Sequence, residues 1–240
     1  FVNGFPIVQV ELKSSGQENK VSDAVRDLQQ YESSVPEAFQ TVLFNAAADT
    51  HKYVVGPVGA PGRHYIPWNR APPEYTTDNE FEHFKQGSQA SLNTSTVLNI
   101  LDNYVFFSEE DGGLAKITPR YMQYYAVENL LNRVQSGEET RGLIWHTQGS
   151  GKTITMLFAA DRLLDADWFE SPQILLLVDT DDLRDQTAET LRNIGYSHLF
   201  ETANSMEHLY EMIRSGKSGI IVSTIQMFEE APKNIQGNPN

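Results

Sequence analysis

The chain has 240 residues, of which 40% are hydrophobic, and its 32 acidic residues outnumber its 18 lysines and arginines to give a net charge of −14. This length and composition suit one large globular domain or two small ones, and the acidic balance argues against non-specific nucleic-acid binding by the chain as a whole. No apolar run long enough to span a membrane, no signal peptide and no cysteine is present, which excludes disulfides and thiolate metal sites and fits a cytoplasmic protein without a membrane partner.

Neither end of the sequence resembles a natural terminus. The chain starts at Phe1, inside an apparent strand and turn and without an initiating methionine, and residues 234–240 directly follow a predicted strand and short helix. We therefore expect a fragment of a longer protein.

Residues 5–13 alternate with period two, which is typical of a β-strand. Val8, Val10 and Leu12 fall on one face, whereas Glu11 and Lys13 fall on the other. A carboxylate beside an ammonium on one strand face could bind a divalent metal, position a water and offset charge on a scissile phosphate. An edge strand with a solvated charged face has the same pattern, so both interpretations stay open.

The residues up to Trp68 predict a small mixed α/β layer. A helix over 22–31, with Ser22 as its N-cap, places Asp27 and Tyr31 on one face because they are four residues apart. Further segments follow in the order strands over 38–46, 51–55 and 64–68, a linker over 69–95 that is partly helical around 80–85, a helix over 95–104, a strand at 106–107 and a turn over 109–113.

A helix opens at Pro119 and runs to about Val134. Gln123 lies on it, 29 residues before Lys152, and its side-chain amide could read both edges of adenine. The alternative is that the neighbouring tyrosines only pack and that Gln123 is solvated.

The segment over 146–153, His-Thr-Gln-Gly-Ser-Gly-Lys-Thr, predicts a phosphate-binding loop. It follows an apolar run over 142–145, which we expect to be a strand, and leads into a helical segment. Backbone N–H groups and the helix dipole would cradle a polyphosphate, Lys152 would reach the β- and γ-phosphates, and the Thr153 hydroxyl would take an Mg²⁺ position. The residues expected to bind ATP are Thr147, Gly149, Ser150, Gly151, Lys152 and Thr153. A chance match in a flexible loop is the alternative.

Two later segments predict a parallel sheet with helices on both faces. The continuous apolar run over 174–178 is typical of a central strand buried on both faces, and it leads through 179–186 into an amphipathic helix that ends near Asn193. A further strand over 219–223 leads into 224–228. Ligands of such sheets lie at the carboxyl ends of the strands.

With these segments in place, the chain resembles the R subunit of type I restriction endonucleases, over essentially its whole length. Residues 3–13 look like that family's nuclease strand, residues 120–127 like its adenine-recognition segment, and residues 145–153 like its first helicase motif, with His146 where other phosphate-binding loops have glycine. Residues 178–186 and 223–226 resemble the next two superfamily-two motifs, which touch the DNA backbone in such motors.

The resemblance implies a PD-(D/E)xK-like endonuclease domain over 1–85 and a first RecA-like motor lobe over 90–240. It implies catalytic roles for Glu11, Lys13 and Tyr31, metal contacts at Glu11 and Thr153, adenine selection by Gln123, and the cofactors ATP and Mg²⁺. Double-stranded DNA and the methylation and specificity subunits would be the partners. Two departures stand out: the family's first metal-binding aspartate would precede Phe1, and Asp27 stands where relatives carry the Gln of a Gln-x-x-x-Tyr helix.

Three other functions remain open at this stage. The first is a superfamily-two repair helicase whose N-terminal module is not a nuclease. The second is a P-loop kinase or switch, disfavoured because it has no need of Ser-Thr-Ile-Gln at a strand end. The third is a binding module without catalysis, which requires the fragment to be the functional unit.

Overall fold

The computed structural model describes residues 1–14, 20–49, 51–68, 79–110 and 113–229. Residues 69–78 of the expected linker, two residues of the turn expected over 109–113 and the segment 234–240 lie outside the described residues. The chain divides into two compact units, Phe1–Phe107 with Leu114–Tyr125 and Ser108–Gly113 with Ala126–Asn240.

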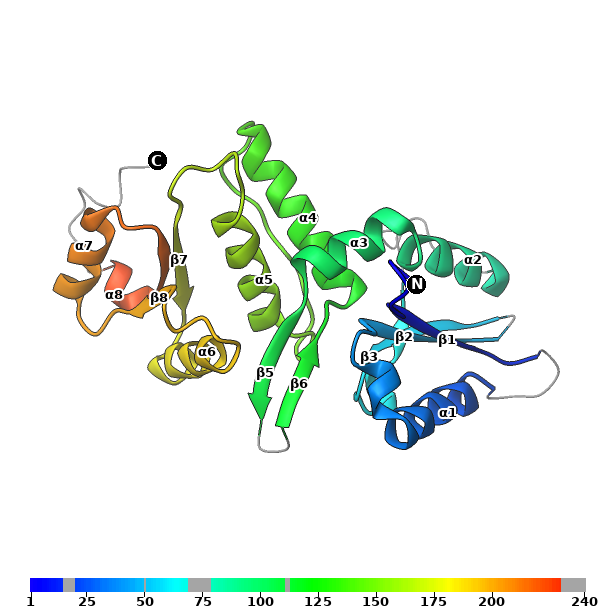
Figure 1. Ribbon diagram of the computed structural model, residues 1–240. Helices are drawn as coiled ribbons and strands as arrows, with labels where there is room; N and C mark the ends of the chain where they lie inside the picture. The colour runs from blue at the N-terminus through cyan, green and yellow to red at the C-terminus, as the bar shows by residue number, and fades with distance from the viewer. Residues whose placement is uncertain (15–19, 50, 69–78, 111–112, 230–240) are drawn as a thin grey trace. The chain divides into compact units, whose positions relative to one another are not determined.

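The first unit is built on a four-stranded mixed sheet in the order β1-β2-β3-β4 (Figure 1). Its strands are β1 (Val8–Leu12), β2 (Phe44–Ala48), β3 (Tyr53–Pro57) and β4 (Ile66–Pro67). β1 and β2 are parallel, and the other two pairs are antiparallel. Helix α1 (Lys20–Ser34) forms the crossover between the parallel strands, as such a connection requires.

Helices cover the two faces of this sheet, with α1 and α2 (Glu80–Ser91) on opposite sides (Figure 1). α1 buries Ala24, Val25 and Leu28 against a cluster of Ala47, Val54 and Tyr65. On the other face, the Tyr53 hydroxyl lies 2.6 Å from the Ser91 hydroxyl of α2. The register pairs Gln9 with Asn45 and Glu11 with Ala47, so Glu11 lies on the face that α1 covers.

Several element boundaries differ from the sequence-based expectations. Ser22 lies inside α1 and is not its N-cap, because the helix already includes Lys20. The strand expected over 38–46 is shortened, since Pro36–Phe39 form a 3₁₀ helix and the Lys116 ammonium takes the backbone carbonyls of Gln40 and Val42 at 2.8 and 2.6 Å. A second 3₁₀ helix, Gly62–His64, likewise occupies the start of the strand expected over 64–68.

The next four elements in the chain after α2 are two helices and two strands. Helix α3 (Thr94–Asn103) matches the expected helix over 95–104. Strands β5 (Phe106–Glu110) and β6 (Gly113–Ile117) form a two-stranded sheet of their own. Helix α4 (Tyr121–Ser136) then begins in the first unit and continues into the second.

The second unit holds a parallel three-stranded sheet, which confirms the predicted parallel arrangement. After α4, this unit contains, in chain order, α5 (Lys152–Leu164), β7 (Gln173–Val178), α6 (Asp181–Asn193), β8 (Phe200–Thr202), α7 (Met206–Ser215), β9 (Gly219–Thr224) and α8 (Ile225–Glu229). Helices α7 and α8 pack on the face that carries Leu175 and Ile221. No helix within the described residues is both long and apolar enough to cross a membrane.

Two expectations for this unit are wrong. The described sheet has the order β7-β9-β8, so β9 is its central strand and β7 lies at an edge. Residues 142–145 form no strand, and Leu143 and Trp145 are 83% and 85% exposed. The physical reason is that an extended segment becomes a strand through a hydrogen-bonded neighbour, and within the described residues no strand pairs with this one.

Candidate functional site

Glu11, Lys13 and Asp27 come together on the α1 face of the first sheet. The Lys13 ammonium donates to Glu11 Oε1 at 2.8 Å and also to Asp27 Oδ2, which projects from α1. Both carboxylates are partly shielded from water, since the side chain of Glu11 is 19% exposed and that of Asp27 34%. The hydrogen bonds to Asp27 and Glu11 raise the pKa of the Lys13 ammonium above its ordinary value, so this group stays charged.

This cluster has the donor chemistry of a magnesium site that shares its ion with a substrate. Magnesium in phosphoryl-transfer sites is commonly held by one or two carboxylates, with waters and substrate phosphates completing the shell, and Glu11 supplies such a carboxylate. The described residues contain no group of three or more acidic or histidine side chains that could hold a metal alone. Tyr31 lies one turn beyond Asp27 on α1, 42% exposed, and does not take part in the contacts that join Glu11, Lys13 and Asp27.

A buried polar network lies on the same face of the sheet, and the sequence did not reveal it. Asn45, fully buried on β2, donates to Glu32 of α1 and to the Tyr65 hydroxyl, the latter at 3.1 Å. The second Glu32 oxygen accepts from the backbone of Gly59 at 3.0 Å. Burial raises the pKa of Glu32 and raises that of Tyr65 to about 12. The network ties α1 to the sheet beside the Lys13 cluster.

The predicted phosphate-binding loop forms a turn that leads into α5. Gly149 and Gly151 have φ of 76° and 81°, in the left-handed region that favours glycine. The Lys152 ammonium lies over the loop and donates to the carbonyls of His146 and Thr147 at 3.1 and 2.8 Å. The Ser150 hydroxyl donates to the same Thr147 carbonyl at 2.7 Å.

The loop geometry fits a polyphosphate in three respects. α5 begins at Lys152, so the positive end of its dipole and its first N–H groups face the turn. Thr147, Gly149 and Lys152 are solvent-exposed, whereas Thr153 is half-buried at the start of the helix. The helix itself is held further along, where Asp161 accepts a hydrogen bond from the Tyr196 hydroxyl.

Gln123 has a structural role at the start of α4. Its Oε1 accepts from the backbone N–H of Arg120 at 2.8 Å, which is the reach-back half of a capping box. Gln123 is 4% exposed, so the alternative of a solvated glutamine is wrong. The neighbouring Tyr124 packs, with its ring centroid 5.2 Å from that of Tyr104.

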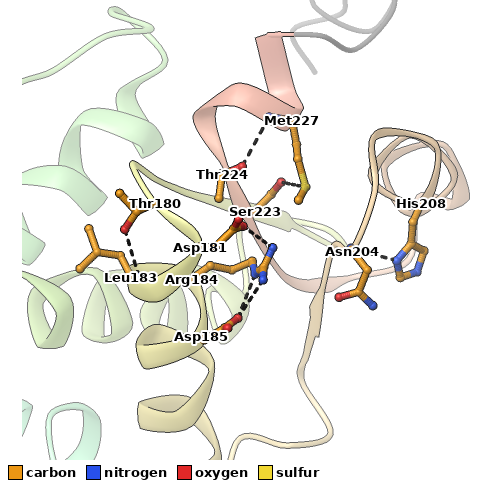
Figure 2. A network of polar contacts seen from close by, with 10 residues as sticks. All are labelled: Thr180, Asp181, Leu183, Arg184, Asp185, Asn204, His208, Ser223, Thr224 and Met227. Carbon is orange, nitrogen blue, oxygen red and sulfur yellow. Dashed lines mark hydrogen bonds and ion pairs between the residues drawn. The ribbon is translucent and has the colours of Figure 1, made fainter.

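The carboxyl ends of β7 and β9 lie side by side at Val178 and Thr224, and polar groups gather there (Figure 2). Thr180 caps α6 by accepting from Leu183 N at 3.3 Å, and the Ser223 hydroxyl contacts Met227 Sδ at 3.8 Å. Arg184, whose side chain is 14% exposed, pairs with Asp181 at 2.6 Å and with Asp185 at 3.0 Å. These are the segments expected to touch DNA, and the Arg184 guanidinium is already engaged by two carboxylates (Figure 2).

Comparison with known proteins finds a matching family model in each half of the chain. Residues 1–63 match the family model for the type I restriction enzyme R protein N terminus, and residues 122–239 match that for the SWI2/SNF2 ATPase. The candidate type I restriction enzyme endonuclease subunit MjaVIIP of Methanocaldococcus jannaschii is 30% identical over 95% of this chain and 23% of its own length. The type I restriction enzyme HindI endonuclease subunit of Haemophilus influenzae is 28% identical over 95% of this chain and 23% of its own length.

These matches confirm the resemblance to type I restriction endonuclease subunits that the motifs indicated. The chain spans 23% of the length of each of these two relatives. The R-protein match contains Glu11, Lys13 and Asp27, and the ATPase match contains the whole loop around Lys152.

Proposed function

We propose that this chain, in which a type I R-protein N-terminal region precedes a SWI2/SNF2 ATPase region, is part of the DNA-translocating and DNA-cleaving subunit of a type I restriction-modification system. The observation that carries the proposal is the placement of two chemically distinct clusters in the two matched regions. Glu11 and Lys13 supply phosphodiester chemistry, and the loop around Lys152 supplies nucleotide binding. ATP hydrolysis would drive duplex DNA past the enzyme, which cuts unmodified DNA after translocation.

In the first region, a PD-(D/E)xK-like nuclease, Glu11 would hold Mg²⁺ and Lys13 would offset the charge that develops on the scissile phosphate. A bound Mg²⁺ supplies Lewis-acid polarisation and a position for the attacking water. The parallel pairing of β1 with β2, which places Glu11 and Lys13 on the face covered by α1, supports this assignment. Tyr31 would contribute from the next turn of α1.

In the second region, a RecA-like lobe, Lys152 and the N–H groups from Gly149 to Thr153 would hold the ATP phosphates, and Thr153 would contact Mg²⁺. Thr147 would contribute its backbone at the exposed side of the loop. Gln123 would select adenine through its side-chain amide. Double-stranded DNA, a methylation subunit and a specificity subunit would be the partners.

The test is cleavage of unmethylated circular DNA by the full-length subunit with its partner subunits, ATP and Mg²⁺. We expect Glu11→Ala to keep ATPase activity and lose cleavage, because only the nuclease cluster is damaged. We expect Lys152→Ala to lose both, since cleavage follows translocation. Glu37→Ala, which removes an exposed carboxylate on the 3₁₀ helix of the same unit, is the matched control and keeps both activities.

Normal cleavage by Glu11→Ala would refute the assignment of the nuclease to residues 1–85. The chain would then belong to an ATPase with a different N-terminal module. Normal ATP hydrolysis by Lys152→Ala would instead remove the motor assignment. The two assignments are therefore tested separately.

A further inference from the structure

The Lys13 ammonium is held from two different elements. Glu11 is its neighbour on β1, whereas Asp27 reaches it from α1, 14 residues away in the chain. A lysine side chain has four rotatable bonds and offers a point charge with no preferred plane, so its position depends on what its neighbours fix. The two carboxylates fix the ammonium above the strand face.

We propose that Asp27 is a positioning residue for Lys13, which keeps the Lys13 ammonium in place when Glu11 turns to a metal ion. This inference rests on the proposed nuclease function and concerns the same cluster. It assigns a role to the position at which this chain departs from the resembled Gln-x-x-x-Tyr pattern.

The need for a second anchor follows from simple electrostatics. A carboxylate that coordinates a divalent cation has less negative charge to offer an ammonium, and the cation repels that ammonium. Glu11 alone would therefore lose its hold on Lys13 at the moment when both groups are needed. Asp27 keeps its charge and continues to hold Lys13 from the helix side.

Asp27 is well placed to act as a fixed anchor. It precedes Leu28, which is fully buried against the sheet, and the same helix is tied down by the contact between Glu32 and Asn45. The Asp27 side chain is 34% exposed, and Lys13 27%. One turn earlier, Asp23 pairs with Arg26 at 3.1 Å, and those side chains are 53% and 73% exposed. Asp23 is therefore a matched control on the same helix.

The first experiment needs no metal and no DNA. The full-length subunit is treated with an amine-reactive ester in the presence of a chelator, and the modification rate of Lys13 is measured by peptide mass spectrometry against that of the exposed Lys52. We expect Asp27→Asn to remove protection, so that Lys13 reacts faster, whereas Asp27→Glu and Asp23→Asn keep the wild-type rate. An unchanged Lys13 rate in Asp27→Asn would overturn the inference.

The second experiment measures cleavage by the subunit with its partners at a series of Mg²⁺ concentrations. We expect Asp27→Asn to lower the cleavage rate at saturating Mg²⁺ by about 10- to 100-fold, the range typical for the loss of an outer-shell partner, with the half-saturating Mg²⁺ concentration unchanged. Asp27→Glu should restore most of the rate, because it returns a carboxylate. ATPase activity should not change in any of these variants.

Three results would overturn the positioning role: wild-type cleavage by Asp27→Asn, a raised Mg²⁺ requirement, which would make Asp27 a metal ligand, or an Asp27→Glu variant as slow as Asp27→Asn, which would indicate packing. Failure of the underlying function looks different. In that case Lys13→Ala itself cleaves at the wild-type rate.

Discussion

Replacing Gly149 with alanine tests whether the loop before α5 binds nucleotide in the conformation that it has here. Gly149 has φ of 76°, and a Cβ added to it meets nothing within 4 Å. The substitution therefore acts on the loop through backbone strain alone, which for an L-residue in the left-handed region amounts to about 1–2 kcal/mol. If ATP binds this conformation, that strain lowers its affinity by about 5- to 30-fold.

The assay is equilibrium binding of a fluorescent ATP analogue to the full-length subunit, with thermal unfolding as the control for folding. Gly149→Asn is the informative partner variant, because asparagine is larger than alanine but adopts the left-handed region more readily. We expect the order of affinity to be wild type, then Asn, then Ala. Wild-type affinity in Gly149→Ala, or a weaker Asn than Ala variant, would refute the argument from backbone conformation.

Three further substitutions test the first unit. Gly56→Ala places a Cβ 2.6 Å from Tyr65 Cδ2, so denaturant unfolding should show a free energy of unfolding lower by about 1–3 kcal/mol. An unchanged free energy of unfolding would mean that the Tyr65 ring moves aside at no cost. Leu28→Ala, at a fully buried position, should lower the free energy of unfolding by about 2–5 kcal/mol. It should also lower DNA cleavage while leaving ATP hydrolysis unchanged, and an equal loss of both activities would contradict this. Burial raises the pKa of Glu32, so the folded state binds its proton more tightly than the unfolded state, and stability falls as the pH rises above the ordinary value of 4.5. Melting temperatures across pH 4–8 should accordingly decline less in Glu32→Gln than in wild type, and parallel profiles would refute the assignment.

Local periodicity predicted those helices and strands that can be recognised from the pattern of their own residues. The helices α3 and α6 lie where apolar spacing placed them, and β9 lies where the apolar run over 219–223 predicted a strand. Strand β8 has only three residues with Glu201 at its centre, and it exists because it pairs with β9, which no local pattern encodes. Helix α7 carries readable signals, with Ser205 as its N-cap and Leu209 and Met212 buried, yet it was not predicted.

In the candidate site, too, some features could be predicted from local sequence patterns and others depend on tertiary packing. Strand alternation alone was enough to place Glu11 beside Lys13, and the four-residue spacing placed Asp27 and Tyr31 on one helix face. That Asp27 reaches Lys13 depends on how α1 lies on the sheet, which is set by the packing of Leu28 and its neighbours and by no spacing along the chain. The failed strand over 142–145 has the same cause, since its formation depends on a partner strand that sequence periodicity cannot supply.

The acidic residues of the chain also pair with the two cations expected to lie near DNA. Lys13 and Arg184 lie in the segments expected to meet DNA, and each is bound by two carboxylates of this chain. A phosphate that contacts either cation does so beside two carboxylates, which repel it. Such a contact contributes far less binding free energy than the release of counterions from an unpaired lysine or arginine. Under the proposed function, these two cations would thus add little to the hold on DNA, and Lys13 would act mainly on the scissile phosphate once the duplex is held elsewhere.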